Sequence, residues 1–369
     1  MIPYIVTEIT EAAERARRIF EAETSWREEW LIEHPSLVFV LTCSDDRMLR
    51  NRLMLHGRPE DFPNLPREDA AKILIPHGMG EVMRNIGASF RWETKLSNHI
   101  MQKVIASGRA PVVFLILSHS DGPNNAKHGC YGMKYDLKAS RRVIEDFASV
   151  VRRVFGELPH RHLAVFTGNV DTSVGDVTLY GADDSILSTS DLLKQDRRAE
   201  FDIGMLQDRL HQIQNIGHLA GYDVATFLAS NMASMRLRNG DNGSMPSFPH
   251  AARGVGYGRF SRWLEIGQGP PLLKVNSHAH ASKTHFKEAL QLALKGAGVD
   301  EVMVNLSCLP FTANPEWPFV RRDAIELALD SRRMTRHLIS EHCSRGDQAR
   351  FVDMAAIVDE STMVVEFLD

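Results

Sequence analysis

Two apolar runs, at 37–42 and 112–118, constrain the fold of this chain more than any other feature. Neither run alternates polar with apolar residues, which is typical of strands buried on both faces of a parallel sheet. Cys43 directly follows the first run, His119 directly follows the second, and Cys130 lies eleven residues beyond His119. The carboxyl ends of strands are where open α/β sheets build their sites. We therefore expect two thiols and one imidazole to meet at one edge of a sheet.

The order of the expected elements favours an α/β fold with a mostly parallel sheet that is flanked by helices on both faces. Residues 8–31 alternate acids and arginines around regularly spaced apolar residues, the pattern of an amphipathic helix. The expected elements in the first half are helix 8–31, strand 36–42, strand 72–76, helix 93–106, strand 112–117 and helix 139–155.

The chain of 369 residues is long enough for two domains, and Gly156 and Pro159 end the last of these helices. We predict a domain at 1–158 and a second at 159–369. The second half resembles a degenerate copy of the first. Residues 163–168 align with 38–43, and residues 297–308 align with 106–119. A helix follows in both halves, at 139–155 in the first and at 322–344 in the second. This internal duplication would place Gly168 where Cys43 stands and Cys308 where His119 stands, so the second copy would be degenerate. The alternative is that any two βα units share such a pattern.

The second half is longer than the first, and the excess lies near 185–260. We expect a helix at 205–218 and a turn-rich loop at 239–244 in this insertion. The glycines at 254–258 lack the Lys-Ser/Thr ending of a phosphate-binding loop and the spacing of a dinucleotide fingerprint, so we interpret them as an ordinary loop.

Charge and cysteine content exclude several classes of protein. The net charge is −4, which does not favour a nucleic-acid partner, and no apolar stretch approaches the roughly 18 residues that a membrane span needs. Only four cysteines occur in 369 residues, which indicates a reducing compartment and a cytoplasmic location rather than a disulfide framework.

Cys43, His119 and Cys130 have the donor chemistry of a catalytic zinc site. Structural zinc usually takes four protein ligands, whereas catalytic zinc takes three and keeps one open position. Two thiolates and a neutral imidazole would leave a neutral Zn²⁺ centre. Water in the open position would have its pKa lowered toward neutrality, which gives a hydroxide nucleophile.

Three motifs resemble the β-class carbonic anhydrases. The sequence Cys43-x-Asp45-x-Arg47 follows a strand, the segment 84–88 resembles the Arg-Asn-Ala-Gly segment of that class, and a histidine and a cysteine follow a neighbouring strand. The His-x10-Cys spacing resembles the divergent carboxysomal shell branch, which also pairs an active domain with a degenerate copy. The resemblance implies reversible hydration of CO₂ to bicarbonate by a zinc-bound hydroxide. Asp45 would orient that hydroxide and Arg47 would hold Asp45.

The resemblance also implies partners and a location. It predicts CO₂ and bicarbonate as substrates and a homodimer, while charge and hydropathy predict no nucleic acid and no membrane as partners. It further predicts shell or cargo proteins of a carboxysome-like microcompartment as partners within the cytoplasm.

Alternatives remain open at this point. Asp45 and its neighbours could cap a helix, where aspartate is favoured, with or without a catalytic role. The same site could hydrolyse carbonyl sulfide or carbon disulfide. Alternatively, the protein could be a non-catalytic shell or scaffold component in which Asp45 is the fourth ligand of a structural zinc ion. His77 and His128 are candidate proton shuttles, against the simpler interpretation of ordinary loop histidines. We interpret His278 and His280 as structural.

Overall fold

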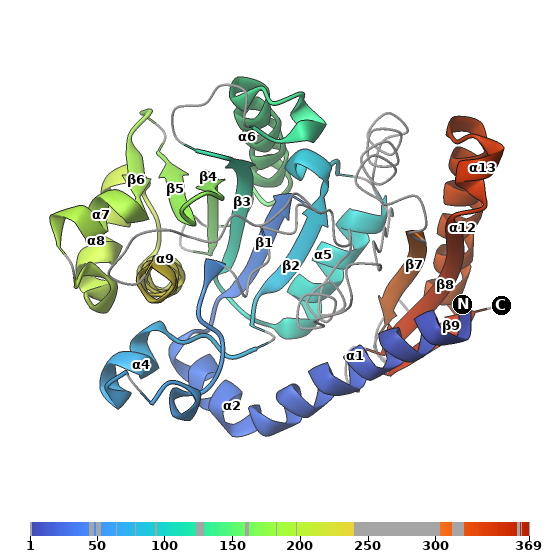
Figure 1. Ribbon diagram of the computed structural model, residues 1–369. Helices are drawn as coiled ribbons and strands as arrows, with labels where there is room; N and C mark the ends of the chain where they lie inside the picture. The colour runs from blue at the N-terminus through green and yellow to red at the C-terminus, as the bar shows by residue number, and fades with distance from the viewer. Residues whose placement is uncertain are drawn as a thin grey trace.

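Two separate sheets make up the strand content of the described chain (Figure 1). One sheet has six strands and the other has three. The computed structural model of the protein describes residues 2–43, 48, 53–63, 65–77, 79–92, 94–122, 129–158, 162–181, 183–196, 198–239, 303–311, 321–359, 362 and 364–368.

The six-stranded sheet is mixed, with four parallel strands followed by two antiparallel ones. The predicted α/β class is confirmed, and the antiparallel edge is an addition to the mostly parallel sheet that we expected. The strands, in sheet order, are β2 (Glu81–Asn85), β1 (Leu37–Cys43), β3 (Val112–Ser120), β4 (Leu163–Asp171), β5 (Asp176–Tyr180) and β6 (Ile186–Ser188).

Helices cover both faces of this sheet, which explains why β1 and β3 are continuous apolar runs until close to their carboxyl ends. All nine residues of β3 are buried. On one face α5 (Thr94–Ser107) and α6 (Leu137–Val154) pack against Phe39 and Phe114. On the other face α8 (Ile203–Ile213) and α9 (His218–Asn239) pack against Val40, Leu115 and Phe166. The segment expected as an insertion at 185–260 therefore supplies helices that cover the first sheet.

The expected strand at 72–76 is wrong. Residues Arg67–Ile73 form helix α4, and Ile75 makes only an isolated bridge with His56. The apolar residues there are buried in the core beside α9, so their apolarity reflects burial and not a strand. The actual neighbour of β1 is β2, whose sequence contains Glu81 and Arg84, two charged residues that are nevertheless buried.

The N-terminal helical segment is divided into two helices, α1 (Ile2–Ala22) and α2 (Thr24–Glu33), where a single helix at 8–31 was expected. The break falls at Glu23, whose buried carboxylate accepts hydrogen bonds from the backbone N–H of His77 and pairs with its Nδ1. Between β6 and α8 lie two short helices, α7 (Thr189–Gln195), which Ser188 caps, and the 3-10 turn Ala199–Phe201.

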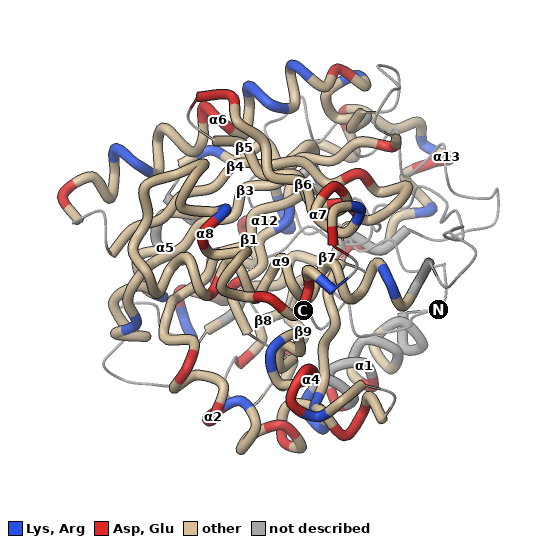
Figure 2. Tube along the Cα trace, turned by 90° about the vertical axis from the view of Figure 1, so that its left-hand side faces the viewer, with Lys and Arg blue, Asp and Glu red and all other residues tan. Residues whose placement is uncertain are grey.

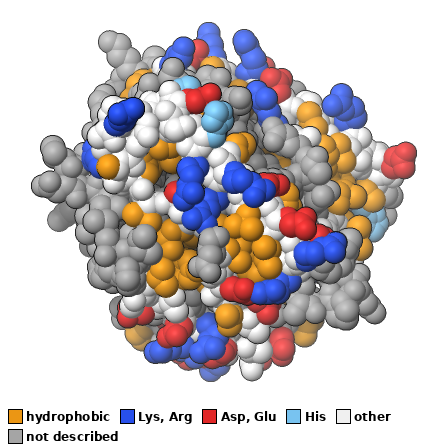
Figure 3. Space-filling view, turned by 90° about the vertical axis from the view of Figure 1, so that its right-hand side faces the viewer, with side chains coloured by type: hydrophobic (Ala, Val, Ile, Leu, Met, Phe, Trp, Pro, Cys, Tyr) orange, Lys and Arg blue, Asp and Glu red, His pale blue; other side chains and the backbone are white. Residues whose placement is uncertain are grey.

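The C-terminal unit consists of β7 (Met303–Phe311), α12 (Arg321–His342), α13 (Arg345–Gln348), β8 (Phe351–Asp359) and β9 (Val365–Leu368). β7 and β8 are parallel, β8 and β9 are antiparallel, and α12 packs on this sheet through Ala324 and Ala328. Figure 3 views the molecule from the side of this unit, where apolar side chains lie between groups of charged ones.

The predicted boundary at 158–159 lies between α6 and β4, which belong to the same six-stranded unit, since β4 pairs with β3 along nine residue pairs. The two strands of the proposed second copy, β4 and β7, lie in different sheets, whereas their counterparts β1 and β3 are neighbours. The internal duplication and the degenerate second domain therefore stay predictions.

Charged residues of both signs are spread along the described chain rather than gathered on one face (Figure 2). None of the described helices combines the length and the apolar character that a bilayer span requires. The predicted loop at 239–244, the glycines at 254–258 and the pair His278 and His280 lie almost wholly outside the described residues.

Candidate metal centre

Cys43, His119 and Cys130 converge at the carboxyl edge of the six-stranded sheet. Their donor atoms all lie within 4.8 Å of one another. Among the described residues, these three form the group of His, Cys, Asp or Glu side chains that could hold a metal ion. The three side chains are 3%, 1% and 4% exposed, respectively. The sequence prediction that these residues share one site is therefore supported by their placement.

The distance between the two sulfur atoms fits one metal ion. The Sγ atoms of Cys43 and Cys130 lie 3.5 Å apart, and no disulfide joins them. Two sulfurs at about 2.3 Å from a tetrahedral zinc ion would lie about 3.8 Å apart, and a disulfide would bring them to about 2.05 Å. Two soft sulfur donors and one imidazole are the donor set that zinc prefers, so the residues present fit this ion.

Strand register brings the first two ligands to the same edge. Cys43 is the last residue of β1, and Thr42 before it pairs with Leu117 of β3, two residues before His119. On the other side Cys43 pairs with Asn85, the last residue of β2. Because β1, β2 and β3 are parallel, their carboxyl ends lie side by side and present these residues together.

A backbone amide from the turn after β2 supports the first ligand. The N–H of Gly87 donates a hydrogen bond of 3.2 Å to Cys43 Sγ. Gly87 has φ +64°, and a Cβ there would lie 2.6 Å from Cε of Met133, whose side chain would have to shift. The turn therefore needs glycine for its backbone conformation. An amide donor stabilises a thiolate, which is the form of cysteine that binds zinc.

The third ligand is held by a tight turn. The carbonyl oxygen of Cys130 accepts hydrogen bonds from the backbone N–H groups of Met133 and Tyr135, at 2.9 and 3.0 Å. Gly129 before it forms an antiparallel bridge with Ser120. After this turn the side chain of Asp136 caps α6 by accepting from the N–H groups of Lys138 and Ala139. Cys130 is thus fixed between the end of β3 and the start of α6.

Arg84 adds a buried positive charge beside the centre. It is 1% exposed, and its Nε donates a hydrogen bond of 3.4 Å to the carbonyl oxygen of Cys43. The next residue, Asn85, donates from Nδ2 to the carbonyl of Ser89 at 2.6 Å, which closes the turn that carries Gly87. Sequence reasoning noted the segment 84–88 for its resemblance and assigned it no contact with Cys43.

The predicted catalytic pair, Asp45 and Arg47, lies outside the described residues, as does His128, one of the two candidate proton shuttles. Of the candidate proton shuttles, His77 is described. Its Nδ1 lies 2.6 Å from Oε1 of Glu23. His77 precedes β2, whereas Asn85, which pairs with Cys43, is the last residue of that strand. A strand of this length spans about 13 Å, so His77 is held away from the metal centre by its contact with Glu23.

The remaining cysteines do not join the centre. Cys308 is buried in β7, and burial raises the pKa of its thiol well above the ordinary value. A thiol that stays protonated is a poor metal ligand. Gly168 lies within β4, opposite Leu117, where a Cβ would be 2.4 Å from the carbonyl oxygen of Thr178. The close approach of β5 leaves no room for a side chain at this position.

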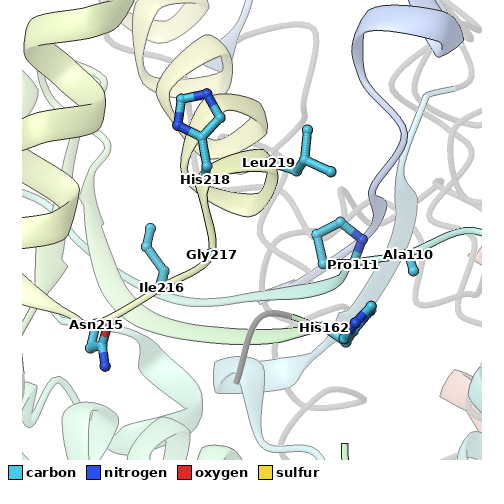
Figure 4. A pocket seen from close by; sticks show the side chains of 8 residues that line it. All are labelled: Ala110, Pro111, His162, Asn215, Ile216, Gly217, His218 and Leu219. Carbon is cyan, nitrogen blue, oxygen red and sulfur yellow. The ribbon is translucent and has the colours of Figure 1, made fainter. Parts of the chain in front are cut away.

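A separate hollow lies at the other edge of the sheet (Figure 4). Its lining residues precede β3 and β4 or join α8 to α9, so they stand at the amino ends of the strands, away from Cys43 and His119. Gln207 donates from Nε2 to Nδ1 of His218 at its rim. We assign this hollow no part in the metal centre. The lining residues are Ala110, Pro111, His162, Asn215, Ile216, Gly217, His218 and Leu219.

No model of a known protein family matches the chain, and no curated protein is significantly similar to it.

Proposed function

We propose that this protein is a zinc-dependent carbonic anhydrase of the β type, which interconverts CO₂ and bicarbonate. The observation that carries the proposal is the convergence of Cys43, His119 and Cys130 within 4.8 Å. Three ligands of this kind, with a fourth position left for water or substrate, are the pattern of catalytic zinc.

Three described residues would hold the ion. Cys43 and Cys130 would bind as thiolates and His119 as neutral imidazole, so that two negative charges would balance Zn²⁺. Their burial lowers the local dielectric, which strengthens the attraction between thiolate and metal. When bound, zinc supplies Lewis-acid activation of a water molecule near neutral pH.

The second coordination layer supports the thiolate of Cys43. The N–H of Gly87 donates to its sulfur, and Arg84 binds its carbonyl oxygen and places a positive charge nearby. Hydrogen bonds of this kind orient ligands and tune the metal. Asp45 and Arg47 complete the proposal through the family resemblance alone: Arg47 holds the Asp45 carboxylate, which then accepts a hydrogen bond from the nucleophile.

The proposal also includes where the enzyme is found and how it assembles. The resemblance to the carboxysomal shell branch favours a cytoplasmic enzyme that associates with a microcompartment, and a homodimer as its assembly. Co-sedimentation with purified shell proteins tests the first, and light scattering of the purified chain tests the second.

Stopped-flow measurement of CO₂ hydration tests the proposed activity. The zinc-loaded protein should accelerate hydration, lose the activity on treatment with a strong chelator, and regain it with Zn²⁺. His119→Ala should be inactive, whereas His211→Ala, at an exposed position on α8, serves as the matched histidine control. A zinc-loaded protein without hydration activity would contradict the proposal. Parallel assays with carbonyl sulfide and carbon disulfide test the alternative hydrolase.

A further inference from the structure

We infer that Asp171 is a positioning residue of the metal centre, because it holds the loop that joins the ligand His119 to the ligand Cys130. This inference rests on the metal site proposed above. Asp171 ends β4, the strand next to β3, and it is 7% exposed. Nothing in the sequence motifs singles it out.

The loop between the two ligands is closed at its base. It leaves β3 after Ser120 and returns at Gly129, and these two residues form an antiparallel bridge. His119 precedes the base on one side and Cys130 follows it on the other. Any opening of the base would therefore move the two ligands apart.

The carboxylate of Asp171 fixes the first residues of the loop. Its Oδ1 accepts hydrogen bonds from the backbone N–H of Gly122 at 3.0 Å, and from the N–H and hydroxyl of Ser173 at 2.9 and 2.6 Å. Hydrogen bonds to a charged acceptor are roughly twice as strong as neutral ones. One side chain thus ties the departing loop to the turn between β4 and β5.

Neighbours of Asp171 fix the residues that flank His119. The N–H and the hydroxyl of Thr172 each donate to the carbonyl oxygen of Ser120 at 2.8 Å. Asn169 donates from Nδ2 to Ser120 Oγ at 2.7 Å, and Ser118 Oγ donates to Asn169 Oδ1 at 3.1 Å. Because alternate residues of a strand point to opposite faces, the two bonds of Asn169 hold β3 on the face that His119 does not use, and the two bonds of Thr172 hold the backbone of Ser120.

The consequence is a preorganised pair of ligands. With the base of the loop fixed, zinc binding need not order the chain between His119 and Cys130, so less conformational entropy is lost. Without Asp171 the loop can detach at Gly122, and Cys130 can leave the ion more often. The expected signature is a faster loss of zinc, since removal of supporting residues of this kind typically weakens metal binding about 10–100-fold.

Asp176 provides a matched control. It pairs with Asp171 across the β4–β5 turn and is 8% exposed. Its carboxylate also accepts several hydrogen bonds, but from Thr178 of β5 and from the start of α7, including the N–H of Ser190 and the hydroxyl of Thr189 at 2.8 Å each. Asp176→Ala therefore removes a comparable buried acceptor from the same hairpin without touching the loop between the ligands.

The experiment measures the zinc dissociation rate of the full-length protein with an excess chromophoric chelator, together with thermal unfolding of the metal-free protein and the absorption spectrum with Co²⁺. Asp171→Ala should release zinc at least about tenfold faster and alter the Co²⁺ spectrum. Asp171→Asn keeps an oxygen acceptor for Gly122 and should fall within about threefold of wild type. Asp176→Ala should lower the unfolding temperature and leave the zinc dissociation rate unchanged.

The outcomes separate this inference from the proposed function. Equal dissociation rates for wild type and Asp171→Ala, or an equally fast rate for Asp176→Ala, would overturn the inference and leave the metal centre in place. A wild-type protein that binds no zinc would overturn both. If Asp171→Ala does not fold, Thr172→Val decides: loss of its hydroxyl bond to Ser120 should speed release by about threefold, and an unchanged rate counts against the inference.

Discussion

The Sγ atoms of Cys43 and Cys130 lie 3.5 Å apart although 87 residues separate them in the sequence. Both residues belong to the same hydrophobic core, on the face of the six-stranded sheet that α9 covers. The pair is therefore assembled by the sheet itself, through the register of β1 with β3 and the turn that follows Gly129. Metal binding should accordingly depend on the folded sheet.

Loss of one ligand should abolish zinc binding. Wild type should contain about one zinc ion per chain by elemental analysis, and Cys43→Ala should contain almost none, because a single thiolate and an imidazole hold zinc weakly. Cys308→Ser is the matched control, since the Cys308 thiol is buried in β7 and its pKa is raised by burial. Full zinc content in Cys43→Ala, or zinc lost with Cys308→Ser, would refute the ligand assignment.

The predicted Asp-Arg pair should act on turnover and not on zinc content. Arg47→Ala should retain zinc and lower the rate of CO₂ hydration by on the order of a hundredfold, as loss of an oriented electrostatic partner often does. Stopped-flow kinetics with zinc-loaded enzyme measure this. Wild-type turnover in Arg47→Ala would show that Arg47 has no catalytic role and is only a neighbour of a helix cap.

Gly87→Ala should damage both stability and metal binding. The backbone strain of a side chain at positive φ costs roughly 1–2 kcal/mol, and the new Cβ would also collide with Met133, three residues after Cys130. Gly108→Ala is the control, because Gly108 has φ +57° with nothing within 4 Å of a Cβ. Urea unfolding should show a larger loss for Gly87→Ala, and zinc dissociation should be faster for that variant alone. Equal losses in both variants would mean that the contact with Met133 is unimportant.

Truncation at residue 158 should prevent folding. A fragment 1–158 lacks β4, so the fully buried strand β3 would expose one edge, and it also lacks the helix α9 that covers one face of the sheet. An exposed apolar edge strand favours aggregation. A fragment 1–239 keeps all six strands and α9 and should be recovered in the soluble fraction. Soluble, active protein from 1–158 would show that β4 and α9 are dispensable.

Apolar runs predicted the strands that matter most to the site. β1 and β3 were predictable because both are buried on two faces, which leaves no polar residue until the strand ends. β2 was missed because Glu81 and Arg84 interrupt its apolar character. Their burial is tolerated through tertiary partners: Lys103 for Glu81 and the carbonyl of Cys43 for Arg84. Such partners lie far away in sequence, and no local pattern reveals them.

The ligands were predictable and their supports were not. Cys43 and His119 end parallel strands, so the rule for sheet edges places them together. The N–H of Gly87 is a backbone group that any residue type carries, and Asp171 acts through the adjacent strand β4. Only the fold shows that these groups reach Cys43 and the loop between the ligands.

X-ray absorption spectroscopy at the zinc edge of the purified wild-type protein tests the central claim most directly. We expect a four-coordinate ion with two sulfur atoms at about 2.3 Å and two lighter atoms at about 2.0–2.1 Å, one of them from His119 and the other from an exchangeable ligand. The lighter shell should change when a small anionic inhibitor is added. A shell with a different number of sulfur atoms, or one that no added ligand alters, would contradict a centre with three protein ligands and an open position.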